Sequence, residues 1–160
     1  MIRALLLVLA AAVGAAVSST SGASAQEAGW SGSYGGVGLA PDASGAELFV
    51  GRLSARGPAV MGVEMGAGFA TGLGTGEAGG HEGRLALTGR LGGDAGGTLV
   101  YGLAGLGVEA GAGGEAGLIL GAGAARRLGH LRLGGEIVHE RHGEAGGGET
   151  RLGGRIAFEF

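Results

Sequence analysis

The stretch that decides the fold is formed by residues 150–160, which read TRLGGRIAFEF. Every second residue from Leu152 to Phe160 is apolar or glycine, and the residues between them are charged or small. A period of two gives a strand one apolar face and one polar face. A soluble edge strand ending on an exposed Phe160 would invite aggregation. A strand placed between lipid and a polar interior would not, so this stretch predicts part of a small transmembrane β-barrel.

Residues 1–25 read as a cleaved secretory signal peptide. Arg3 supplies the positive start, residues 4–17 form an apolar run, and residues 23–25 (Ala-Ser-Ala) offer a small-residue cleavage site. A membrane-spanning helix is the alternative, but the run is shorter than the roughly 20 residues that such a helix needs. The mature chain is then a single domain over residues 26–160. With no second long apolar run, a closed barrel is its remaining way to cross a bilayer.

The composition excludes several classes of protein. The chain has no cysteine, so a disulfide scaffold and a thiolate zinc site are ruled out. A formal charge of −3 lacks the excess of basic residues that is typical of nucleic-acid-binding proteins, and we expect no nucleic-acid partner. The 42 glycines lack the three-residue period of collagen and alternate instead with aliphatic residues.

Eight strand-like segments follow the signal, most of them about nine to eleven residues long, which suffices to cross a bilayer at a steep tilt. In the segment 98–109, Leu99, Tyr101 and Leu103 share one side. The facing of 47–53 stays open, because its apolar residues occupy both sides. The segments are 30–40, 47–53, 61–69, 84–92, 98–109, 117–126, 131–141 and 150–160.

Connections of different length alternate along most of this chain. Residues 93–97 and 127–130 form short turns, whereas 71–83, 110–116 and 142–149 form longer loops. Outer-membrane barrels show this asymmetry, with short turns on the inner, periplasmic side and longer loops outside. An extracellular ligand, if the protein has one, would therefore meet these three longer loops.

Charged residues gather on the face opposite most large apolar side chains. A soluble lipocalin-type barrel is the alternative, with this polar face outside. An arginine on a lipid face would cost about 2–4 kcal/mol, and an eight-stranded interior holds side chains only. We therefore predict an all-β fold, an eight-stranded antiparallel up-and-down transmembrane barrel with a polar, side-chain-filled interior. The lumen charges, which we expect to pair and plug rather than to line a narrow porin-like channel, are Glu64, Arg84, Arg90, Arg132, Glu136, Arg151, Arg155 and Glu159.

Several short motifs occur in order along the mature chain: Trp30-Ser-Gly-Ser-Tyr34-Gly-Gly, Gly62-Val-Glu64, Gly89-Arg90-Leu91-Gly92, Leu99-Val-Tyr101-Gly, Gly121-Ala-Gly123, Gly135-Glu136 and Phe158-Glu-Phe160. With them the chain resembles the small outer-membrane β-barrels of Gram-negative bacteria, the opacity and immunogenic-antigen "porin family" related to the OmpA and OmpX barrels. It departs from that family at Ile137 and His139, where aromatic residues are usual. The aromatic residues available for membrane girdles are few: Trp30, Tyr34, Phe49, Phe69, Tyr101, Phe158 and Phe160.

The resemblance implies a place in the cell outer membrane, reached by export through the signal peptide. It also implies that Phe160, with Phe158 and Ile156, is the signal read by the outer-membrane insertion machinery. Its partners would then be outer-membrane lipid, that machinery and periplasmic chaperones. The expected role is envelope integrity or surface interaction, with an adhesin or surface antigen as the sharper alternative.

Enzymatic, cofactor and metal functions find little support in the sequence. A lipid A deacylase of this size would need a serine two residues from a histidine, but the last serine is Ser54. Residues 139–142 (His-Glu-Arg-His) lack the second histidine that a metalloprotease motif requires at Gly143. A glycine-rich dinucleotide-binding motif is followed by a helix, but no helical pattern follows the glycine-rich residues 111–116. We therefore expect no catalytic site, no cofactor and no metal.

Overall fold

A computed structural model describes residues 29–39, 45–70, 83–110, 114, 116–142 and 148–160. The predicted signal peptide, residues 1–25, lies outside these ranges. Among the described residues, no helix is long and apolar enough to cross a membrane. The strands are β1 (Gly32–Leu39), β2 (Gly45–Arg56), β3 (Ala59–Ala70), β4 (Gly83–Asp94), β5 (Thr98–Ala110), β6 (Ala116–Leu128), β7 (Leu131–His142) and β8 (Gly148–Glu159).

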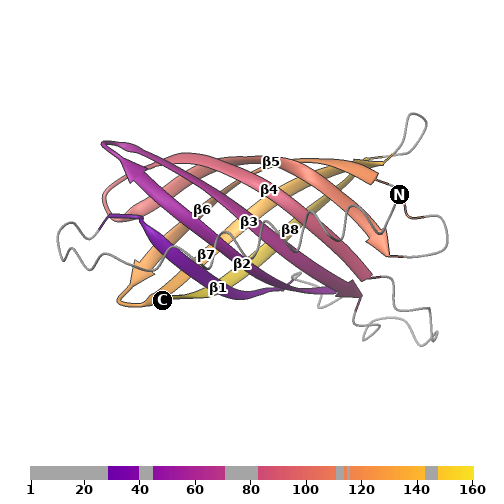
Figure 1. Cartoon of the computed structure of the whole chain (residues 1–160), viewed down its shortest axis with the longest axis horizontal. Coiled ribbons are helices and arrows are strands. Elements are labelled where there is room, and N and C mark those ends of the chain that lie inside the picture. Colours follow the sequence, from indigo (N-terminus) through magenta and orange to yellow (C-terminus); the bar gives the residue numbers. More distant parts are fainter. Residues whose placement is uncertain (1–28, 40–44, 71–82, 111–113, 115, 143–147) are drawn as a thin grey trace.

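The eight strands form a closed antiparallel barrel in which each strand pairs with its neighbours in the sequence. The strands are steeply tilted to the long axis (Figure 1). β1 closes the barrel against β8, where Gly35 lies opposite Phe158 and Val37 opposite Ile156. Closure leaves no unpaired sheet edge. The predicted fold class, an all-β, eight-stranded up-and-down barrel, is confirmed.

Three tight turns define one end of the barrel, here called the turn end. They join β2 to β3, β4 to β5 and β6 to β7, and Phe160 lies at the same end (Figure 1). Gly57 and Gly129 take φ values of 59° and 65°, the left-handed region that side chains other than glycine rarely adopt. The opposite end is called the loop end. Most residues of the predicted ligand-binding loops, 71–83, 110–116 and 142–149, lie outside the described ranges.

Side chains alternate between a polar lumen and an apolar outer surface. The alternation is clearest on β3, where Met61 and Val63 are exposed while Glu64 is 4% exposed. On β2, Leu48 and Val50 face outward and Phe49 and Leu53 face the lumen, which settles the facing of residues 47–53. Every strand contributes exposed apolar side chains to the outer surface, among them Val37, Leu48, Met61, Leu87, Val100, Leu118, Leu133 and Leu152.

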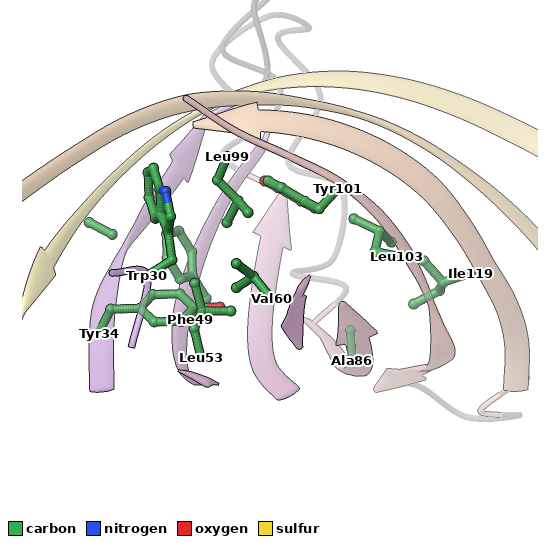
Figure 2. Packing of buried hydrophobic residues seen from close by; sticks show 11 residues of the cluster. Trp30, Tyr34, Phe49, Leu53, Val60, Ala86, Leu99, Tyr101, Leu103 and Ile119 are labelled. Atoms are coloured by element: carbon green, nitrogen blue, oxygen red, sulfur yellow. The ribbon is translucent and has the colours of Figure 1, made fainter. Parts of the chain in front are cut away.

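The lumen holds more apolar material than the sequence pattern indicated. Leu99, Tyr101 and Leu103 do share one side of β5, but that side is the lumen, whereas Val100 and Leu106 face outward. Apolar residues occupy both faces of this strand, so the alternation alone did not distinguish them. Four of the seven aromatic residues are also buried inside the barrel instead of forming a girdle (Figure 2): Trp30, Tyr34, Phe49 and Tyr101.

The turn glycines give a first prediction. Replacing Gly129 by valine should destabilise the barrel by about 1–2 kcal/mol, because a β-branched residue is strained at this φ. Asparagine tolerates the left-handed region, so Gly129→Asn should cost less. Urea unfolding of the protein folded in detergent micelles compares the two variants, and equal costs would contradict a backbone origin.

Candidate functional site: a charge network that fills the lumen

Two arginines and two glutamates cross-link the middle of the lumen. The Arg155 guanidinium donates to Glu136 Oε1 at 2.6 Å and to Glu64 Oε1 at 2.7 Å. Arg90 donates to Glu64 Oε1 at 2.6 Å and also to Glu136 Oε1. Each arginine therefore bridges both carboxylates. The two positive and two negative charges of these four side chains sum to zero. All four side chains are at most 10% exposed. We call this set the central layer.

Two tyrosines complete the central layer. The Tyr34 hydroxyl donates to Glu64 Oε2 at 2.8 Å, and the Tyr101 hydroxyl donates to Glu136 Oε1 at 2.6 Å. Each glutamate thus accepts from one tyrosine and two arginines. Arg90 also lies over the Tyr101 ring, with its Cζ 4.8 Å from the centroid. Buried charges are tolerated only when such partners satisfy them.

The central layer has an approximate two-fold repeat. Tyrosine, glutamate and arginine come from β1, β3 and β4 in one half of the barrel and from β5, β7 and β8 in the other. The two sets are therefore related by a shift of four strands in a barrel of eight. They are Tyr34, Glu64 and Arg90, and Tyr101, Glu136 and Arg155.

A glycine lies beneath each tyrosine in the same repeat. Gly51 pairs with Tyr34 on one side and with Glu64 on the other, and Gly123 occupies the equivalent place in the second half. A Cβ on Gly123 would lie 2.7 Å from the Tyr101 hydroxyl and 2.8 Å from Glu136 Cγ. The glycine therefore lets the tyrosine lie across its strand and reach the glutamate two strands away.

A second layer lies toward the loop end and converges on Glu140, which is 1% exposed. Arg84 donates to Glu140 through Nε at 3.1 Å and contacts its other oxygen through Nη2 at 2.7 Å. Arg151 donates to the same carboxylate. Three strands, β4, β7 and β8, are thereby connected across the lumen.

A third layer lies toward the turn end and converges on Glu159. Arg127 contacts Glu159 Oε1 at 3.0 Å, and Arg132 donates to the same oxygen. Trp30 packs beside both arginines, with their Cζ atoms 5.2 and 5.3 Å from its ring centroid. Arg132 also lies 4.7 Å from the Tyr34 centroid, which connects this layer to the central one.

The layers leave little open space at mid-barrel. A cavity of about 40 Å³ lies between the central layer and the turn end, and one of about 30 Å³ lies on the loop side. Nearer the loop end the space widens to about 430 Å³, bordered by Glu47, Arg84 and Arg151. In the described part of the chain, the central layer therefore separates this wide mouth from the turn end.

The structure places all eight expected lumen charges inside the barrel and distributes them over the three layers. Sequence reasoning missed four further members. Tyr34 and Tyr101 read as girdle aromatics, Arg127 as a turn residue, and Glu140 as part of a zinc-like motif. Glycine stands two residues before Glu64 and before Glu136, each time five residues after a left-handed turn glycine, but this repeat marks the two glutamates and none of the four missed residues.

The zinc-like motif is divided between the two faces of β7. Glu140 faces the lumen, whereas His139 is exposed on the outside, with Nδ1 2.9 Å from Thr150 Oγ1. The side chain of His142 lies outside the described part. Among the described residues, no group of three or more histidine, aspartate or glutamate side chains is arranged to hold a metal ion.

Of the three residues expected to form the insertion signal, Ile156 and Phe158 lie on the outer face of β8, and Phe160 directly follows that strand. Ile156, Phe158 and Phe160 are 42, 60 and 78% exposed. The Phe160 amide donates to the Ser33 carbonyl at 3.0 Å, at the seam where β8 meets β1. Their recognition by the insertion machinery stays a prediction.

Comparisons with known proteins identify a similar fold. No family model matches the chain, and no curated protein matches it. Among solved structures, the barrel is similar to the Yersinia pestis outer membrane protein Ail, whose backbone structure was determined in a phospholipid bilayer nanodisc. The TM-score is 0.56 at 12% identity, and the match covers 80% of this chain and 97% of Ail. The likeness shows a shared fold, that of a small outer-membrane barrel.

The central layer gives a second prediction. Glu136→Ala should destabilise the barrel by about 3–5 kcal/mol, because Arg90, Arg155 and Tyr101 lose a shared acceptor. Glu149→Ala is the matched control, since Glu149 is an exposed residue near the loop end. Urea unfolding in lipid vesicles measures both. A cost for Glu136→Ala no larger than that of the control would show that the network is energetically unimportant.

The glycine under Tyr101 gives a third prediction. Gly123→Ala should destabilise the barrel and shift the near-ultraviolet tyrosine signal, because the new methyl group displaces the Tyr101 hydroxyl from Glu136. Gly102→Ala is the control, because a Cβ on Gly102 would have only an ordinary contact at 3.9 Å. Unchanged spectra in both variants would contradict this role of Gly123.

Proposed function

We propose that this protein is an integral outer-membrane β-barrel with a structural, envelope-stabilising role, and that it is neither a wide pore nor an enzyme. Outer-membrane lipid is then its permanent environment. The insertion machinery and periplasmic chaperones are its partners during assembly.

The observation that supports this proposal is the inverted distribution of polar and apolar side chains. Leu87, Leu106 and Leu118 lie side by side on three neighbouring strands, and all three are exposed on the outer surface. Among the described residues, the charged side chains that are buried inside are Glu64, Arg90, Arg132, Glu136 and Glu140. A water-soluble barrel would expose this apolar surface to solvent, which favours association. Hydrocarbon accommodates it, and the backbone bonds of a closed barrel are satisfied without water.

The filled lumen supports a structural role over a transport role. The central layer crosses the barrel axis with six side chains held by mutual bonds, and the cavities on either side are small. Opening a path would separate buried charges from their partners, which costs several kcal/mol. A protein reconstituted in planar bilayers should therefore show no steady open conductance.

Membrane insertion gives a fourth prediction. Leu106→Arg should destabilise the barrel in vesicles by about 2–4 kcal/mol, because a charge would face hydrocarbon. Leu106→Ala should cost less. In a soluble barrel the arginine variant would be harmless at a position that is 58% exposed.

Cell fractionation should find the wild-type protein in outer membranes as a heat-modifiable band. A soluble periplasmic protein without a heat shift would contradict the proposal.

The carboxyl terminus gives a fifth prediction. Deleting Phe160 should reduce assembled barrel in cells, while refolding of the purified variant into detergent stays efficient, because the residue is 78% exposed and packs little. Phe69→Ala is the control, an exposed phenylalanine on β3. Undiminished heat-modifiable barrel in outer membranes would contradict a role as insertion signal.

A further inference from the structure

The described strands divide their charges by sign between the two faces of the barrel wall. The acidic residues of these strands all occupy positions on the lumen side, as Glu64 and Glu140 do. Outward positions hold arginine instead: Arg52, Arg56, Arg126 and Arg141. The surface that the proposed function assigns to lipid therefore carries positive charge and no acidic side chain within the described strands.

Arg126 lies among apolar side chains near the turn end. It is exposed on β6, where Leu128, 54% exposed, occupies the next outward position toward the turn. Leu133, 39% exposed, lies directly opposite Arg126 on β7. A charge surrounded by lipid-facing side chains is unfavourable unless its head reaches the headgroup region or an anionic partner.

The acidic groups near this rim are engaged elsewhere. Within the described part of the chain, Arg126 makes no hydrogen bond and no ion pair. Asp94 accepts a hydrogen bond from the Gly97 amide at 2.7 Å inside the β4–β5 turn. Glu159 lies in the lumen, on the other side of the wall. The terminal carboxylate of Phe160 follows β8, which is separated from β6 by β7. The partner of Arg126 is therefore sought outside the barrel.

Thr98 adds a second donor beside Arg126. The two residues are paired in the register of β5 and β6, so both side chains lie on the outer surface, with Cβ atoms about 5 Å apart. The Thr98 hydroxyl has no hydrogen-bond partner among the described residues either. Arginine and threonine side chains both donate hydrogen bonds to phosphate oxygens. The pair therefore offers a small phosphate-binding site on an apolar wall.

This wall also lacks outward aromatic residues that would anchor it at the membrane surface. In the described chain such residues are Phe69 on β3, Phe158 on β8 and Phe160 after it, whereas Tyr101 of β5 faces the lumen. Interfacial tryptophan and tyrosine usually anchor a barrel at the headgroups. An arginine can replace them, because its aliphatic stem lies on apolar surface while its charged head reaches the headgroup region.

We propose that Arg126 and Thr98 bind the phosphate of an anionic phospholipid in the leaflet at the turn end. The guanidinium and the hydroxyl donate to the phosphate oxygens, and Leu128 and Leu133 contact the acyl chains. A zwitterionic lipid binds less well, because its own cation competes with Arg126 for the phosphate. This inference rests on the proposed function, since it requires the barrel to lie in a bilayer.

Solid-state NMR provides a direct test. The full barrel, with isotope-labelled arginine Cζ atoms, is refolded into vesicles that contain phosphatidylglycerol, and the dipolar coupling between Cζ and lipid phosphorus is measured. We expect the coupling to decrease in Arg126→Lys. Arg127→Lys is the matched control, because Arg127 is the next residue but contacts Glu159 in the lumen. No decrease in Arg126→Lys, or an equal decrease in both variants, would overturn the proposal.

A stability measurement tests the preference for anionic lipid. Urea unfolding is compared in phosphatidylcholine vesicles with and without phosphatidylglycerol at equal ionic strength, which holds screening constant. Both leaflets contain the lipid, so the orientation of the barrel does not matter. Phosphatidylglycerol should lower the unfolding equilibrium constant of the wild type. Arg126→Gln should reduce this effect about 5-fold, the attraction expected for one arginine at an anionic surface.

Two further variants separate a bound lipid from diffuse attraction. Thr98→Val keeps every charge but removes the hydroxyl, and should lose part of the phosphatidylglycerol effect. Arg56→Gln removes an exposed outward arginine directly before the turn glycine Gly57, and should lose less than Arg126→Gln. Equal losses in the two glutamine variants, or a Thr98→Val variant identical to wild type, would overturn the proposal.

Insertion itself is scored in the same samples by the heat-modifiable band. A barrel that inserts fully but is equally stable with and without phosphatidylglycerol would overturn the lipid site and leave the proposed function intact. A barrel that inserts into neither kind of vesicle would overturn both.

Discussion

Glu64 and Glu136 each accept bonds from the same two arginines, and the rest of the barrel depends on that shared arrangement. Strand pairing alone fixes each strand only against its neighbours. The central layer connects β3, β4, β7 and β8 directly through the lumen, so that opposite walls are held at a defined separation. Such bonds add little net energy compared with apolar packing. Their main effect is on specificity: a barrel with a different strand register would leave these buried charges without partners, which is costly.

The apolar part of the lumen complements this network. Phe49 lies beneath Arg155, whose Cζ is 3.6 Å from the ring centroid, and Leu53, Leu99 and Val60 fill space toward the turn end (Figure 2). Aromatic faces accept guanidinium groups, and their edges pack against aliphatic carbon. The lumen is therefore a mixed core, in which aromatic rings pack against the guanidinium groups of the central and turn-end layers.

The predictable part of this protein follows from its period of two. Where one face carries charges, as at Glu64 on β3 or Arg90 on β4, alternation assigned lumen and outer surface correctly. It failed on β5, because Leu99 and Leu103 line the lumen while Leu106 faces outward, and no charge distinguishes the two faces at mid-strand. The partner of each charged residue could not be predicted from the sequence, for a different reason. The contact of Arg90 with Glu136 joins residues 46 apart, and it depends on the stagger of the closed barrel, which no local pattern specifies.

The central layer joins the first four strands to the last four, and this has a consequence for folding. The bonds of the central layer join β1–β4 to β5–β8, so β1–β4 of one molecule could bond to β5–β8 of another with the same set of contacts. The side chains thus do not distinguish a closed monomer from an exchanged dimer. The short connection 95–97, where Ala95 donates to the Thr98 carbonyl at 2.8 Å, makes the difference by keeping the two halves of one chain at high effective concentration. Lengthening this turn would weaken that advantage and favour entanglement of neighbouring chains.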